Sequence, residues 1–163
     1  MTTERTIVTK RIPNRVDWPS WMRVAEREVG TRETPGGLTD NPRIIEYMRA
    51  TRLEDNEKLL HDETAWCASF ASWCLEQSGQ KNPRYAMAKN FLSYGDIVNP
   101  ADAQFGDILV FRRGKDSAHA HVCFYVLDLG GDYEVLGGNQ RNSVCFSHER
   151  KEDLLNARRP VLP

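Results

Sequence analysis

Two segments of the chain carry the residue types of a thiol nucleophile and its base. The segment Asp62–Phe70 predicts the start of a helix that contains Cys67, and His119–Tyr125 predicts a strand that carries His119 and His121. Backbone N–H groups at a helix start and a neighbouring imidazolium both lower the pKa of a thiol, from roughly 8.5 by several units. The pattern therefore predicts a cysteine hydrolase.

The expected start of the helix determines what Cys67 can do. Asp62 and Thr64 are both candidate N-caps, so Cys67 falls in or just after the first turn. There the helix dipole favours an anion, and the outward N–H groups can hold the oxyanion of an acyl-transfer intermediate. A buried, inert thiol is the alternative, because cysteine is among the most buried residue types. The position of Cys67 favours the nucleophile.

The histidines are assigned to one face of their strand. Side chains alternate along a strand, so His119, His121, Cys123 and Tyr125 share a face, and either histidine can meet Cys67. A half-buried structural side chain is the alternative for a strand histidine. When paired with a cysteine, the histidine takes the thiol proton and later gives a proton to the leaving amine.

The imidazole also needs an acceptor on its other ring nitrogen. The next predicted strand and its end offer Glu134, Asn139 and Gln140. Asn139 is favoured, because Gly137 and Gly138 let backbones approach closely and an amide oxygen holds an imidazole without titrating. Simple turn chemistry is the alternative, since glycine and asparagine dominate turns.

Two further interpretations concern the neighbours of this pair. Trp66 either lines a substrate groove beside Cys67 or packs in the core, where a tryptophan buries much area. A metal site of Cys67, His119, His121 and Cys123 has suitable ligand types. Its spacing matches no common zinc pattern, so no metal is expected.

The elements that position these residues follow a helix-then-sheet order. Apolar spacing predicts four helical segments, one between Asp17 and Gly30, one that opens at Asn41-Pro42, one from about Thr64 to Ser78, and one from Arg84 to Ser93. Short β-rich runs follow at Asp107–Arg112, Ala120–Asp128, Tyr133–Leu136 and Ser143–Ser147. This order predicts an α+β domain in which the Cys67 helix packs against an antiparallel meander.

Length and charge limit the class of protein. The chain has 163 residues, of which 40% are hydrophobic and 28% charged, as in an ordinary globular protein. We expect a single domain over residues 17–163, preceded by an N-terminal extension, residues 1–16. The formal net charge of -1 and the pI near 6.4 argue against a nucleic-acid partner.

The composition also bears on cellular location. Met1–Asn14 lacks the apolar core of a secretory signal, and no segment approaches the length of a membrane span. We therefore expect a protein that is made in the cytoplasm and is not exported by the general route. The cysteines, which are Cys67, Cys74, Cys123 and Cys145, form no CxxC pair, so reduced thiols are expected.

Several of these segments together resemble a known family. The resemblance covers roughly Trp18 to Phe146 and rests on Trp66–Phe70 followed by Trp73, Gly106–Phe111, His121-Val122 and Gly137–Gln140. This order is similar to the CHAP and NlpC-type peptidoglycan hydrolases, which are papain-like cysteine amidases and peptidases. The upstream pieces Gly30–Glu33 and Asn41–Ile44 are similar to a subgroup common in phages and bacterial genomes.

The resemblance implies roles for individual residues. It implies Cys67 as nucleophile at a helix N-terminus, His121 as base because Val122 follows it, and Asn139 as the third polar residue. Many CHAP enzymes carry a carboxylate just before that asparagine, where this chain has glycine, so Glu134 remains an alternative. Trp66, His119 and Gln140 are the residues expected to border the substrate.

The resemblance also implies an activity. It is hydrolysis of an amide bond of the peptidoglycan stem, by an endopeptidase or amidase that needs no cofactor and acts as a phage lysin or antibacterial effector. We expect a monomer that reaches the periplasm or cell exterior by non-classical delivery, with a cognate immunity protein if it is an effector. Two alternatives are a non-catalytic cell-wall-binding module and a papain-type thiol enzyme or acyltransferase with a non-wall substrate.

Overall fold

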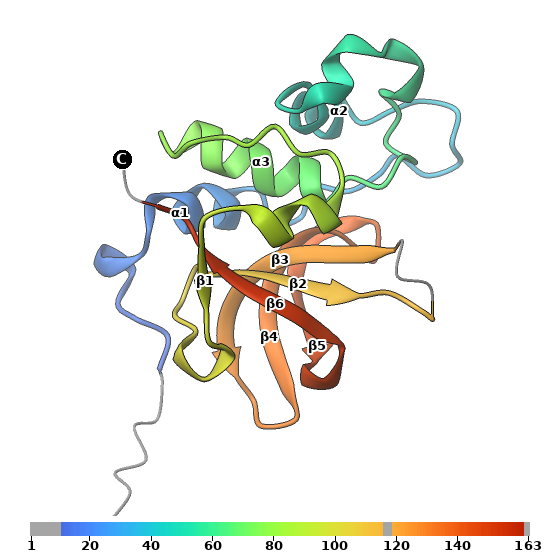
Figure 1. Cartoon of the computed structure of the whole chain (residues 1–163). Coiled ribbons are helices and arrows are strands. Elements are labelled where there is room, and N and C mark those ends of the chain that lie inside the picture. Colours follow the sequence, from blue (N-terminus) through green and yellow to red (C-terminus); the bar gives the residue numbers. More distant parts are fainter. Residues whose placement is uncertain (1–10, 116–118, 162–163) are drawn as a thin grey trace, which may run out of the picture.

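The computed structural model describes residues 11–115 and 119–161, and these form a helical layer on a single sheet (Figure 1). The helices are α1 (Ser20–Arg27), α2 (Pro42–Arg49) and α3 (Cys67–Gln77). The strands are β1 (Asp96–Val98), β2 (Ile108–Arg112), β3 (Ala120–Asp128), β4 (Asp132–Gln140), β5 (Ser143–Arg150) and β6 (Leu154–Arg159). Short 3-10 turns are η1 (Arg15–Asp17), η2 (Arg52–Asp55), η3 (Glu57–Leu59), η4 (Ala88–Ser93), η5 (Pro100–Asp102) and η6 (Lys151–Asp153).

The sheet confirms the predicted α+β class. Its six strands run in the order β1-β6-β2-β3-β4-β5, and every neighbouring pair is antiparallel. Strands β2 to β5 form the predicted meander. Strand β6, which the sequence did not predict, returns to the other side of β2, where Ala157 is buried and Arg159 pairs with the buried Asp107. Its two arginines bind groups from distant segments, Arg158 the carbonyl of Leu92 and Arg159 the carboxylate of Asp107, so the strand has few apolar residues for the sequence to reveal.

The first two helices begin and end close to the predicted positions. Helix α1 buries Trp21, Met22 and Ala25, and the chain turns at Gly30, where φ is 99°. Val29, which lies in the predicted stretch, is 43% exposed because the helix ends at Arg27. Helix α2 is N-capped as predicted, because the Asn41 side chain accepts the amide N–H of Arg43.

Helix α3 is the central element, since it packs on β3 and β4 and on both other helices. Its residues from Cys67 to Leu75 are all buried, and the chain leaves the helix at Gly79, where φ is 77°. A helix enclosed on every side has no amphipathic stripe. The apolar spacing from which the sequence predicted this helix therefore marks only one side of a helix that is buried all round.

The predicted caps of this helix are wrong. Trp66 occupies the N-cap position, and no side chain caps the first turn. Asp62 instead accepts the backbone N–H groups of Thr34 and Asn41 at 3.0 and 2.8 Å, and Thr64 donates its hydroxyl to Leu59. Both side chains are used by the preceding loop, which leaves the amides at the start of α3 without a side-chain acceptor.

The fourth predicted helix is shorter than expected. The segment Arg84–Ser93 forms only η4 at its C-terminal part, because Arg84 has a left-handed φ of 59° that is incompatible with a helix. Its buried Ala88 and Phe91 nevertheless pack on the helix-side core. The segment therefore covers the sheet as the sequence suggested, without forming an α-helix.

The core divides between the two faces of the sheet, as strand alternation predicts. Val122, Phe124 and Val126 belong to the cluster that contains the helices, whereas Cys123 and Tyr125 belong to a second cluster on the opposite face. The side chain parity of β3 is thus as expected from the sequence.

The predicted N-terminal extension is described only in part. Residues 1–10 lie outside the described residues, and at residues 11–16 the carbonyl of Pro13 accepts the indole N–H of Trp18 at 2.9 Å. The division into an extension and one domain over 17–163 stays a prediction. Among the described residues, none of the helices has the length and apolar character that crossing a membrane requires.

Close packing of β4 on α3 gives a stability prediction. A methyl group at Gly138 would lie 2.7 Å from Phe70 Cβ and from Trp66 Cζ3, so Gly138→Ala is expected to lower the free energy of unfolding by about 1–3 kcal/mol. Gly131→Ala is the matched control, because nothing lies within 4 Å of its new Cβ. We expect that control to change stability by less than about 0.5 kcal/mol in urea denaturation. Equal midpoints for the two variants would contradict the packing.

Candidate active site

Cys67 is the first residue of α3. The first hydrogen bond within the helix runs from the N–H of Phe70 to the carbonyl of Trp66 at 2.9 Å. The amides of Cys67, Ala68 and Ser69 precede that bond and so have no acceptor within the helix. Cys67 is 7% exposed, so protein atoms enclose almost all of this residue and another molecule can contact only a small part of it. This position suits an anion, since the positive end of the helix dipole lies there.

His121 lies near the start of β3, and this strand packs against α3, the helix that begins with Cys67. The Cys67 thiol and the His121 ring interact closely enough for each to shift the pKa of the other, and the backbone N–H of Val122 also favours the anionic sulfur. The imidazole is 4% exposed. The structure thus brings together the cysteine and the histidine that the sequence paired.

The opposite ring nitrogen of His121 is held by Gln140. The Nε2 atom lies 2.9 Å from Gln140 Oε1, and Gln140 Nε2 donates to the carbonyl oxygen of Cys145 at 2.6 Å. Because that carbonyl can only accept, the amide is fixed with its oxygen towards the imidazole. The ring nitrogen Nε2 must then carry the proton, so in the neutral ring Nδ1 keeps the lone pair that accepts a thiol proton.

Asn139 was the predicted third residue, and the structure corrects this choice to Gln140. Plain alternation along β4 would put Asn139 on the face of Gly137, towards His121. The chain instead inserts an extra residue between Gly137 and Gln140, and Asn139 takes a left-handed φ of 54° at this bulge. The bulge exchanges the faces, so Gln140 and not Asn139 points at the ring.

The glycines of this segment make room for the arrangement. A Cβ on Gly137 would lie 2.8 Å from Gln140 Oε1 and from Cys123 Cβ, and one on Gly138 would meet the start of α3. Close backbone approach was expected at these glycines, and the structure shows which groups approach. Gln140, one of the three candidate acceptors and also expected to border the substrate, is 5% exposed and lies against the His121 ring.

The electrostatics favour a charge-separated pair. Burial by itself raises the pKa of the Cys67 thiol, but the hydrogen bond and positive charge of His121 outweigh it, with help from the N–H groups of Val122 and Ala68. The pKa of Cys67 therefore lies below its ordinary value. Burial lowers the pKa of His121, whereas contacts with Cys123 and Cys67 raise it, and the net pKa is well above the ordinary value. Both shifts run in the direction that favours a thiolate paired with an imidazolium.

A second thiol also contacts His121. Cys123 is buried in the apolar cluster on the other face of the sheet, and this burial raises its pKa, which the hydrogen bond to His121 offsets only in part. Cys123 lies within β3, whereas Cys67 lies at a helix start. Beside the same imidazole, the pKa of Cys67 is therefore lowered and that of Cys123 is raised.

The remaining predicted residues lie apart from this centre. Trp66, a candidate for substrate contact, is fully buried and donates its indole N–H to Glu33 at 2.9 Å, so it belongs to the core. Glu134, the alternative orienting residue, pairs with Leu127, six positions along β3 from His121, and cannot hold the ring. His119 is exposed beside the start of β3, where a groove residue could lie.

The alternative metal site is not assembled. Over residues 11–115 and 119–161, no three side chains of the metal-binding types His, Cys, Asp and Glu come together as a metal ion would require.

Comparisons with known proteins support the fold. The sequence matches no protein-family model, and no curated protein matches it. Among solved structures, it is similar to a Staphylococcus aureus subsp. aureus Mu50 protein described as similar to lipoprotein, NLP/P60 family, with a TM-score of 0.52 and 16% sequence identity. The match covers 97% of this chain and 46% of that protein, so the chain spans about half of its length. The likeness shows a papain-like α+β fold.

The pKa directions predict which cysteine is alkylated first. At about pH 6, iodoacetamide should modify Cys67 before Cys145, although Cys145 is the more exposed thiol, because only a thiolate is reactive. His121→Ala should remove this preference, since the imidazolium that lowers the pKa of Cys67 is lost. Peptide mass spectrometry over time gives the order of labelling, and faster labelling of Cys145 in the wild-type protein would refute the activation.

The bulge predicts which amide supports the histidine. Gln140→Ala should slow alkylation of Cys67 at about pH 6 by roughly tenfold or more, because the imidazole loses the bond that orients it. Asn139→Gly is the matched control next to it, since glycine keeps the left-handed backbone, and it should alkylate at the wild-type rate. The reverse ranking would return the orienting role to Asn139.

Proposed function

We propose that this protein is a cysteine hydrolase that cleaves an amide bond of the peptidoglycan stem peptide. The observation that carries the proposal is the Cys67 thiol at an uncapped helix start, whose pKa is lowered by an imidazole that Gln140 holds at its Nε2 atom. The fold of an NLP/P60 family protein and the resemblance to CHAP and NlpC-type hydrolases support the choice of substrate.

The proposed reaction follows from the positions of these groups. The Cys67 thiolate attacks the carbonyl carbon of the amide, and N–H groups at the start of α3 donate hydrogen bonds to the oxygen, on which negative charge develops. His121 donates a proton to the nitrogen as the C–N bond breaks, which leaves a thioester and a free amine. Water then attacks the thioester with His121 as base, and the carboxylic acid leaves Cys67 as a thiolate.

The proposal also covers the delivery of the protein, its partners, its oligomeric state and the role of His119. Peptidoglycan lies outside the cytoplasm, so the protein reaches it by lysis, a phage holin or a secretion machine, as a phage lysin or an antibacterial effector. A cognate immunity protein is expected in the second case. The protein acts as a monomer, without a cofactor, and His119 at the start of β3 borders the substrate.

The proposal predicts a specific product. Purified sacculi incubated with the protein should release muropeptides or free stem peptides with one new amine and one new carboxylate, and mass spectrometry identifies the bond. EDTA should leave the rate unchanged, because a thiol and an imidazole perform every step. Cys67→Ala is the control, and it should release nothing while keeping its fold.

The pH profile should be a broad bell. Activity falls at low pH, when the thiolate of Cys67 is protonated, and at high pH, when His121 loses the proton needed by the leaving amine. Because the pKa of Cys67 is lowered and that of His121 is raised, the acid limit moves down and the alkaline limit moves up. The plateau between them should include neutral pH. Intact sacculi together with rapid labelling of Cys67 would contradict the wall substrate and favour a thiol enzyme or acyltransferase acting elsewhere.

A further inference from the structure

A charged pair lies behind His121 that the proposed reaction does not use. Glu149 of β5 has a side chain that is 9% exposed, and its Oε1 lies 3.9 Å from His121 Nε2. Arg113, which follows β2, binds both oxygens of this carboxylate, with Nη1–Oε2 at 2.8 Å and Nη2–Oε1 at 2.6 Å. The carboxylate is therefore close to the imidazole but outside hydrogen-bonding distance.

Several elements contribute groups to the surroundings of His121. The titratable or polar groups that face it are Cys67 from α3, Cys123 from β3, Gln140 from β4 and Glu149 from β5, with the Arg113 guanidinium beyond the last. The next groups out are Cys145 and Arg141, which contact each other and Gln140. Glu149 is the carboxylate in this set.

The geometry of the pair determines what it can do. A carboxylate near an imidazole favours the protonated ring, and its effect is strong where water is excluded. An unpaired buried carboxylate is costly, and it would gain by hydrogen-bonding Nε2 directly in place of Gln140. The bidentate bond to Arg113 holds the carboxylate in place and offsets part of its charge. Glu149 thus acts on the ring through its field, and Arg113 attenuates that field.

We propose that Glu149 and Arg113 form a positioning pair that sets how readily His121 gives up its proton, and with it the alkaline limit of the active pH range. The pair touches neither the thiol nor the substrate, so both are positioning residues. The inference rests on the proposed role of Cys67 and His121 as an ion pair.

The pair predicts opposite effects for its two members. In Glu149→Gln the imidazolium loses a neighbouring negative charge, so the pKa of His121 should fall by about one pH unit. In Arg113→Met the negative charge of Glu149 is no longer partly neutralised by the guanidinium, so the pKa of His121 should rise. Arg113→Lys keeps the positive charge and should remain near the wild-type pKa. Titration of the His121 ring signals by NMR measures each value in the full chain without any substrate.

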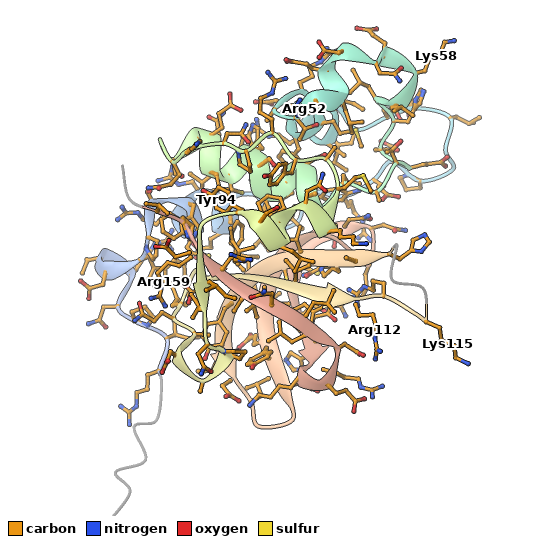
Figure 2. All side chains as sticks on the ribbon, viewed as in Figure 1. Arg52, Lys58, Tyr94, Arg112, Lys115 and Arg159 are labelled. Carbon is orange, nitrogen blue, oxygen red and sulfur yellow. The ribbon has the colours of Figure 1, made fainter. Side chains whose placement is uncertain are left out.

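A neighbouring ion pair provides the control. Arg112, beside Arg113 at the end of β2 (Figure 2), pairs with Asp153 at 3.0 Å. Arg112→Met and Asp153→Asn remove charges of the same types without touching the surroundings of His121, and should leave its titration unchanged. Shifts of the same sign in Glu149→Gln and Arg113→Met, or no shift in either, would overturn the inference.

The measurement separates this inference from the proposed function. If sacculi remain intact but the two variants shift the His121 titration in opposite directions, the wall substrate is wrong and the positioning pair stands. If sacculi are degraded and the titrations do not move, the pair is structural. Where the protein is active on sacculi, the alkaline limb of the pH profile should follow the NMR values in both variants.

Discussion

The central interaction is the placement of the His121 imidazole between Gln140 and Cys67. Gln140 accepts from Nε2 and cannot turn, because its own N–H₂ group is bound to the carbonyl of Cys145. The other edge of the ring is therefore committed to the thiol of Cys67. Without this constraint two buried cysteines would compete for a freely rotating ring. With it, the thiol that also lies at a helix start becomes the anion.

Two backbone features make this arrangement of Cys67, His121 and Gln140 possible. The start of α3 is left without a side-chain cap, because Asp62 serves the amides of a preceding loop. The bulge at Asn139 turns Gln140 towards the ring, and Gly138 allows β4 to approach the helix closely. In each case a local irregularity supplies what a regular helix or strand would not, namely free N–H groups and a side chain on the required face.

The sequence predicted the class of fold and the pairing of Cys67 with His121, because both depend on local patterns. Glycines marked the ends of α1 and α3, alternation placed His121, and Cys67 lay near a predicted helix start. Among the three candidate acceptors Asn139 was preferred to Gln140, because a bulge reverses alternation without any sign in residue types beyond two glycines. The Glu149–Arg113 pair was missed because Glu149 lies on β5 and Arg113 follows β2, so the two meet only after folding.

The most direct test of the thiolate–imidazolium pair is the ultraviolet absorbance of thiolate as a function of pH. Wild-type protein should show one thiolate at neutral pH that is absent from Cys67→Ala and that moves to the pH of an ordinary thiol, roughly 8.5, in His121→Ala. Equal absorbance of wild-type protein and Cys67→Ala at neutral pH would contradict the account, because Cys67 would then be a neutral buried thiol.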